Sequence, residues 1–125
     1  MHSILTFGSH EGHTNPHYNE EIMPSAEITD NAPLHRFELE VRGETAVLVY
    51  EKAGNLLRLV HTEVPQSLEG QGVGTKLVSG VLRFARENNL SVVPLCPFVA
   101  QYVKRHHEYS TIVDPSHRWM IDSAT

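Results

Sequence analysis

A glycine-rich run, Glu69-Gly70-Gln71-Gly72-Val73-Gly74-Thr75-Lys76, separates a segment typical of a β-strand from one typical of an amphipathic helix. Glycines can adopt positive φ and let the backbone approach a ligand without a side chain in the way. Backbone N–H groups in such a loop, continued into the first turn of a helix, bind phosphate oxygens. The order of strand, glycine loop and helix therefore predicts a phosphate-binding site on an α/β scaffold.

The segment after the glycines is predicted to form a helix from Val73 to Arg86, ending near Asn88-Asn89. Its apolar residues recur every three or four positions, which places them on one helix face. They are Val73, Leu77, Val78, Val81, Leu82 and Ala85. This helix is therefore expected to pack with one face on a sheet.

Two common phosphate-binding motifs do not fit the glycine run. A nucleotide-hydrolysing P-loop has its Lys directly after the last glycine, whereas Thr75 stands between Gly74 and Lys76 here. The dinucleotide fingerprint G-x-G-x-x-G also fails, because the three glycines are spaced two and two. Nucleotide binding of either kind is disfavoured.

The flanking segments predict an antiparallel meander followed by a parallel pair of strands. Strands are expected at 37–41, 46–51, 56–64, 91–96 and 109–113, and a second helix at 98–106. Short turns join the first three strands, so these pair antiparallel. The predicted helix joins the third strand to the fourth, so that pair is parallel. Pro94 has no N–H to donate, which leaves one side of the fourth strand unpaired there.

Length and composition indicate one globular domain flanked by two extensions. The 125 residues include 40% apolar and 20% charged residues, which is ordinary for a globular domain. We place a flexible N-terminal extension at 1–33, the domain at 34–114 and a C-terminal tail at 115–125, with Trp119 as the tail's anchor. The histidines of the extension are expected to bind no metal, since Pro16 interrupts the helix that would align His13 with His17.

Charge and cysteine content limit the partners and the compartment. A formal net charge of −5 argues against nucleic acid or an anionic membrane as the main partner. One cysteine permits no internal disulfide, and no apolar run reaches the length of a membrane span. No Lys or Arg precedes Arg36, unlike a basic targeting peptide. A cytoplasmic protein, monomeric or weakly dimeric, is the expectation.

The glycine pattern after Val64-Pro65 resembles motif A of the GNAT superfamily of acyl-CoA-dependent N-acetyltransferases. Further segments, in order, are similar to the minimal, YjdJ-type GNAT family of small stand-alone domains. These segments are His61-Thr62-Glu63-Val64-Pro65, Cys96-Pro97-Phe98-Val99, Tyr102 and 106–109, and the likeness covers 34–114. The chain departs from the family at Glu69, where most of the superfamily has Arg or Gln, and at His107, where Pro is usual.

The resemblance implies a GNAT-like mixed sheet with two main helices and a splayed parallel pair that takes the pantetheine arm of coenzyme A. Acetyl-CoA is the implied co-substrate, with its pyrophosphate on the N–H groups of the loop. The implied coenzyme-binding residues are Val64, Gly70, Gln71, Gly72, Val73, Gly74, Thr75 and Tyr102. The backbone N–H near Val64 would polarise the thioester carbonyl, and Tyr102 would line the channel.

Cys96 and His61 are the candidate catalytic residues. Cys96 ends the predicted fourth strand, and the resemblance places it close to the acetyl group as an acid, a base or a transient acyl carrier. A buried free cysteine behaving as a small apolar residue is the alternative. His61 is a credible base for an ammonium substrate, or a structural histidine in the third strand. A β-bulge in that strand would change which face it occupies.

The implied activity is acetyl-CoA-dependent N-acetyl transfer to an unidentified amine or lysine acceptor. The alternative is a non-catalytic domain that binds acyl-CoA as a sensor or interaction module. The residues at 106–109 could supply an acid for the departing thiolate. The end of the second helix, where cationic side chains interact favourably with the helix dipole, is the preferred explanation for this cluster. The sequence does not identify the acceptor.

Overall fold

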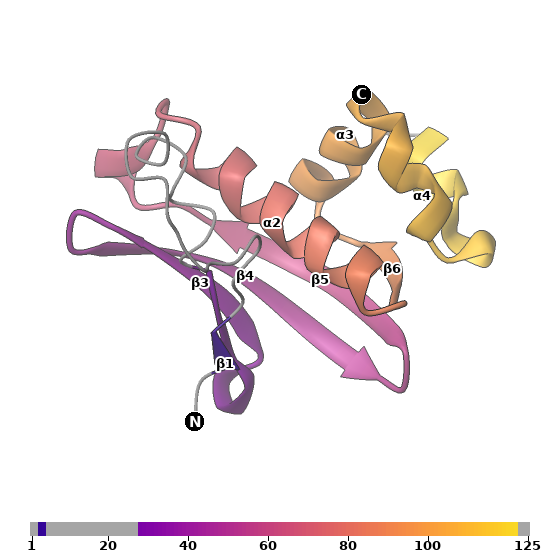
Figure 1. Ribbon diagram of the computed structural model, residues 1–125. Coiled ribbons are helices and arrows are strands. Elements are labelled where there is room, and N and C mark those ends of the chain that lie inside the picture. The colour runs from indigo at the N-terminus through magenta and orange to yellow at the C-terminus, as the bar shows by residue number, and fades with distance from the viewer. Residues whose placement is uncertain (1–2, 5–27, 123–125) are drawn as a thin grey trace, which may run out of the picture.

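The computed structural model describes residues 3–4 and 28–122, which form one mixed sheet with helices on one side (Figure 1). The strands are β1 (Ser3–Ile4), β2 (Thr29–Asn31), β3 (Arg36–Val41), β4 (Glu44–Ala53), β5 (Leu56–Glu63) and β6 (Ser91–Pro94). The helices are α2 (Val73–Glu87), α3 (Pro97–Arg105) and α4 (Trp119–Asp122). Short 3₁₀ turns are η3 (Ala32–Leu34), η4 (Gln66–Leu68), η5 (His107–Ile112) and η6 (Pro115–His117).

The sheet has the order β1-β2-β3-β4-β5-β6, with every pair antiparallel except β5 and β6. Tight turns at 42–43 and 54–55 join β3 to β4 and β4 to β5, and these turns permit only antiparallel pairing. Helix α2 provides the crossover from β5 to the parallel strand β6. The predicted α/β fold, with an antiparallel meander and a parallel pair, is confirmed.

The core lies between α2 and the sheet face that it covers (Figure 1). The sheet contributes Phe37, Leu39, Ala46, Leu48, Leu57 and Leu59, and the helix contributes Leu77, Val78, Val81, Leu82 and Ala85. All are at most 1% exposed. Burial of each large side chain contributes about 1.5–3 kcal/mol relative to exposure, so this interface fixes where α2 begins. The helix boundaries agree with the predicted 73–86 to one residue.

A β-bulge interrupts β5 and reverses the facing of its second half. Val49 is paired with His61 and Tyr50 with Leu59, so Val60 is skipped in the register. Before the bulge, Leu57 and Leu59 are buried on the helix side. After it, Thr62 is paired with the buried Leu48, so the even-numbered residues now face the helices.

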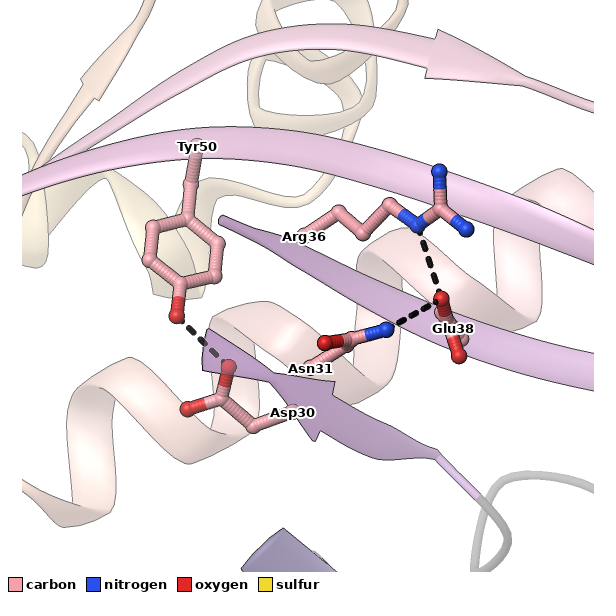
Figure 2. Close-up of polar contacts among 5 residues, drawn as sticks. All are labelled: Asp30, Asn31, Arg36, Glu38 and Tyr50. Carbon is pink, nitrogen blue, oxygen red and sulfur yellow. Dashed lines mark hydrogen bonds and ion pairs between the residues drawn. The ribbon is translucent and has the colours of Figure 1, made fainter. Parts of the chain in front are cut away.

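The boundary of the expected flexible extension at 33 is wrong by several residues, because β2 is an integral strand of the sheet. The Tyr50 hydroxyl donates to Asp30 at 2.6 Å, as Figure 2 shows. In the same figure, Glu38 accepts from Asn31 at 3.0 Å and from Arg36 at 2.7 Å. These contacts tie β2 to β3 and β4. Residues 1–2 and 5–27 of the extension, including His10, His13 and His17, lie outside the described residues.

The C-terminal segment also differs from expectation. The strand predicted at 109–113 is the 3₁₀ segment η5, and a single bridge joins Val113 to Val92. Tyr109 and Ile112 are three residues apart, so a 3₁₀ turn, unlike a strand, brings both against the core. Trp119 is 59% exposed, and the tail is anchored by Ile121, which is 8% exposed. No helix in the described ranges is long and apolar enough to cross a bilayer.

Candidate functional site

A pocket of about 530 Å³ opens beside the N-terminus of α2. It is lined by Thr62, Val64, Leu68, Glu69, Gly70, Gly72, Val73, Gly74, Thr75 and Phe98. The glycine run forms one end, which we call the loop end. The other end, which we call the strand end, is formed by Thr62 of β5, by Val64 just after that strand and by Phe98 of α3.

The loop end requires its glycines for two different physical reasons. Gly70 and Gly72 have φ of 81° and 79°, a conformation that L side chains rarely adopt. Gly74 is needed for space, because an added Cβ would lie 3.2 Å from Val64 Cγ2 and 3.3 Å from the Phe98 ring. The glycines thus shape the loop and keep the entrance to the strand end open.

Local hydrogen bonds fix the loop ahead of the helix. The N–H of Leu68 donates to the Pro65 carbonyl at 2.8 Å, and Leu68 is 1% exposed. Gly72 is the N-cap of α2, and its carbonyl accepts the first helical bond from Lys76 at 3.0 Å. The N–H groups of the first helical turn therefore have no intrahelical acceptor. They belong to the segment 71–75, where the sequence predicts an anion-binding cradle.

At the strand end, a side-chain contact spans the gap between β5 and β6. The ladder ends at the pair Leu59 and Pro94, after which the Cys96 N–H still donates to the Leu59 carbonyl at 2.9 Å. The Thr62 hydroxyl then lies 3.4 Å from Cys96 Sγ. Cys96 is 4% exposed and is not among the residues that line the pocket, so it lies behind Thr62.

His61 is not brought to the pocket. Its side chain is 56% exposed and its Nε2 lies 3.1 Å from Glu63 Oε2, whose side chain is 68% exposed. The bulge turns both side chains away from the face that carries Thr62. His61 remains next in sequence to that pocket residue, on the other side of the strand.

Tyr102, predicted to line the coenzyme channel, does not contribute to the pocket lining. Its ring stacks on that of His106 with centroids 3.9 Å apart, and its carbonyl is bonded to His106 Nδ1 at 2.9 Å. The ring also lies 6.3 Å from that of Tyr109. Tyr102 therefore belongs to an aromatic cluster at the C-terminal end of α3.

Sequence reasoning missed four lining residues: Thr62, Leu68, Glu69 and Phe98. Three of them stand inside the quoted motifs, but the facing of Thr62 depends on the bulge, Phe98 is 42% exposed, and Glu69 was noted only as a departure from the family pattern. Glu69 is the one ionisable side chain among the described lining residues. The described part of the chain holds no group of three or more metal-ligating side chains.

The fold thus combines a parallel strand pair, whose ladder ends at Leu59 and Pro94, with a glycine loop that opens a helix beside a pocket. Residues 36–112 match the model of the GCN5-related N-acetyltransferase family, and the chain belongs to this family. The sequence-based assignment to the GNAT superfamily is thereby confirmed.

Several known proteins are similar to this chain. Protein NATD1 of Mus musculus is 34% identical over 74 residues, which is 57% of this chain and 67% of the mouse protein. Protein NATD1 of Xenopus tropicalis is 30% identical over 92 residues, which is 70% of this chain and 84% of the Xenopus protein. The NMR solution structure of a GCN5-like protein from Staphylococcus aureus has a TM-score of 0.52 and 30% identity, covering 64% of this chain and 81% of that one.

Proposed function

We propose that this protein is an N-acetyltransferase that takes the acetyl group from acetyl-CoA and passes it to an amine or a lysine side chain. Family membership supports the class of activity. The loop end of the pocket is the observation that supports acetyl-CoA as the ligand. Its first-turn N–H groups, together with glycines at positive φ, suit a pyrophosphate.

The remaining space suits the pantetheine arm of the coenzyme. The pocket continues from the loop end past Val64 to Thr62, beyond the point where the β5–β6 ladder ends. A side chain at position 74 would narrow this path between Val64 and Phe98. Gly70, Gly72, Gly74 and the backbone of the first helical turn would hold the phosphates, and the thioester would lie toward the strand end.

Acetyl transfer requires polarisation of the thioester carbonyl, loss of a proton from the amine and stabilisation of the departing thiolate. We assign the first task to the backbone N–H near Val64. Cys96, behind Thr62 at the strand end, is the first candidate for proton transfer. His61 is the second, and it would act from the opposite side of β5, where its partner is Glu63.

One observation favours the alternative of a non-catalytic acyl-CoA-binding module. Among the described lining residues, Glu69 is the one ionisable side chain, and it belongs to the loop end. Cys96 is buried and His61 faces away from the pocket. A binding module would retain affinity for acetyl-CoA and release no free thiol in the presence of any acceptor.

The experiment that tests the ligand is calorimetric titration with coenzyme A of the parent and of Gly72→Glu. The substitution places a carboxylate in the cradle and a side chain at a φ of 79°. Thr111→Glu, an exposed substitution in η5, adds the same charge outside the pocket lining and serves as the control. Affinity of Gly72→Glu within about threefold of the parent would show that the site is wrongly placed.

Activity is tested separately, with acetyl-CoA and a thiol-release assay over a panel of amines and lysine peptides. Thiol release that depends on the acceptor supports the transferase. Binding of acetyl-CoA without release across the panel would favour the binding module. Absence of binding would contradict both functions.

A further inference from the structure

The hairpin turn between β3 and β4 contacts the glycine loop, although the two are far apart in sequence. The guanidinium of Arg42 donates through Nη2 to the side-chain carbonyl of Gln71, across 29 positions of the chain. Gln71 in turn donates to the Ser67 carbonyl at 3.0 Å. The Ser67 hydroxyl is bonded to the carboxylate of Glu44, at the start of β4. The hairpin thus delivers a permanent cation to the loop end of the pocket.

The local backbone is unfavourable for the residue that stands there. Arg42 and Gly43 have φ of 50° and 81°, so both central residues of this two-residue hairpin loop are left-handed, as in a type I′ turn. Asn, Asp and Gly are the residues that such turns prefer. The β4–β5 turn, by contrast, has Gly54 at its first position with φ of 61°. Turn formation by itself therefore does not account for an arginine at 42.

The charge of the loop end gives a reason for this arginine. Glu69 lines the pocket and Glu44 is bonded to the loop, so two carboxylates lie where the proposed ligand would bring phosphates. Like charges within a Debye length oppose binding. Gln71 lies between two lining glycines, so its contact holds the guanidinium at the edge of the cradle. A guanidinium has five N–H donors, and the bond to Gln71 uses one.

We infer that Arg42 is a phosphate-binding residue of the coenzyme site, offsetting Glu69 and donating to a phosphate group of coenzyme A. The inference rests on the proposed function, since it concerns the same pocket. It assigns to the hairpin a role that the glycine loop cannot fulfil with backbone N–H groups alone. Arginine suits this role because its planar fork matches phosphate oxygens.

The test compares coenzyme A binding by calorimetry at low and high salt for the parent, Arg42→Gln and Gln71→Ala. We expect Arg42→Gln to weaken binding by about tenfold or more at low salt, the size of one charge-assisted contact, and by less at high salt, where charges are screened. Gln71→Ala removes the brace and keeps the cation, so its loss should be smaller. Arg118→Gln, an exposed arginine after η6, makes the same change in net charge and should bind as the parent does.

A second ligand and a second variant sharpen the test. A loss that persists with 3′-dephospho-coenzyme A places Arg42 on the pyrophosphate, and a loss that disappears places it on the 3′-phosphate. Arg42→Asn suits the turn better, so it should raise Tm by about 3 °C while weakening coenzyme A binding as Arg42→Gln does. A variant that is more stable yet binds less well cannot owe its loss to misfolding.

Three results would overturn the inference. If Arg42→Gln binds coenzyme A with the affinity of the parent, Arg42 does not contact the ligand. Equal, salt-independent losses in Arg42→Gln and Gln71→Ala would show that the arginine only braces the loop. Failure of the parent protein to bind coenzyme A would overturn the proposed function and the inference with it. If the parent binds coenzyme A and Arg42→Gln binds it equally well, only the inference is overturned.

Discussion

The loop end of the pocket is built from one short segment, 68–75, in which every residue except the predicted Gln71 lines the pocket. The strand end is built from Thr62, Val64 and Phe98, which belong to separate parts of the chain. The loop end follows from local backbone preferences, since glycines at positive φ lead directly into α2. The strand end depends on a bulge that turns Thr62 toward the helices and on α3, which brings Phe98 to the pocket. A local motif can therefore define where a ligand binds, while the chemistry beside it depends on distant contacts.

The largest effect is expected from Gly74→Val, which acts where the two ends meet. The new side chain would overlap Val64 and Phe98, both already about 3.3 Å or less from the position of a Cβ. We expect the free energy of unfolding to fall by about 1–3 kcal/mol and coenzyme A binding to be lost. Urea denaturation and calorimetry measure the two effects. Ser79→Val, one turn further along α2 and outside the pocket lining, is the control for a β-branched residue in this helix, and equal losses there would contradict the steric explanation.

Cys96→Ala tests whether the strand end carries chemistry. If the thiol transfers a proton, the turnover number should fall by about a hundredfold, while coenzyme A binding at the loop end stays within about twofold. Thr62→Val keeps the volume and removes the hydroxyl that lies 3.4 Å from the thiol. A smaller loss in this variant would separate positioning of the thiol from its direct participation. Parental turnover in Cys96→Ala would exclude the thiol and leave His61 as the remaining candidate.

His61→Ala is expected to have a smaller effect, about tenfold at most, because the side chain is exposed and paired with Glu63 on the other side of β5. Steady-state rates of His61→Ala and Glu63→Gln with acetyl-CoA are the measurement. A loss in His61→Ala as large as that in Cys96→Ala would show that the acceptor approaches from the face opposite the pocket.

Tyr50→Phe tests a region remote from both ends and should leave coenzyme A binding unchanged. Burial, together with the hydrogen bond to Asp30, raises the pKa of the Tyr50 hydroxyl above its ordinary value. Because the folded state holds this proton more tightly, the stabilisation is fully present below about pH 10 and is lost as the pH rises further.

The substitution should lower the free energy of unfolding by about 1 kcal/mol near pH 8, and the difference from the parent should shrink near pH 11. Urea denaturation at the two pH values is the measurement. A difference that stays constant or grows with pH would contradict the assigned role of the hydroxyl.

The sequence by itself determined the meander, the crossover helix and the loop end, because each follows from short-range physics. Alternation and apolar periodicity predicted β3, β5 and α2, and the glycines predicted a phosphate-binding cradle at 71–75. The family likeness also followed from motifs in a fixed order, and the family match confirmed it.

Tertiary structure alone decided which residues meet at the strand end and at the rim of the cradle. Because Val60 is skipped in the pairing, His61 faces outward and Thr62 faces the helices. The alternation of apolar and polar residues in the sequence does not reveal such a bulge. Tyr102 stacks on His106, because the end of α3 packs away from the pocket. Arg42 reaches Gln71 only because the sheet brings a hairpin to a loop 29 residues away. Contacts between distant segments depend on the register and twist of the whole sheet, which no local pattern encodes.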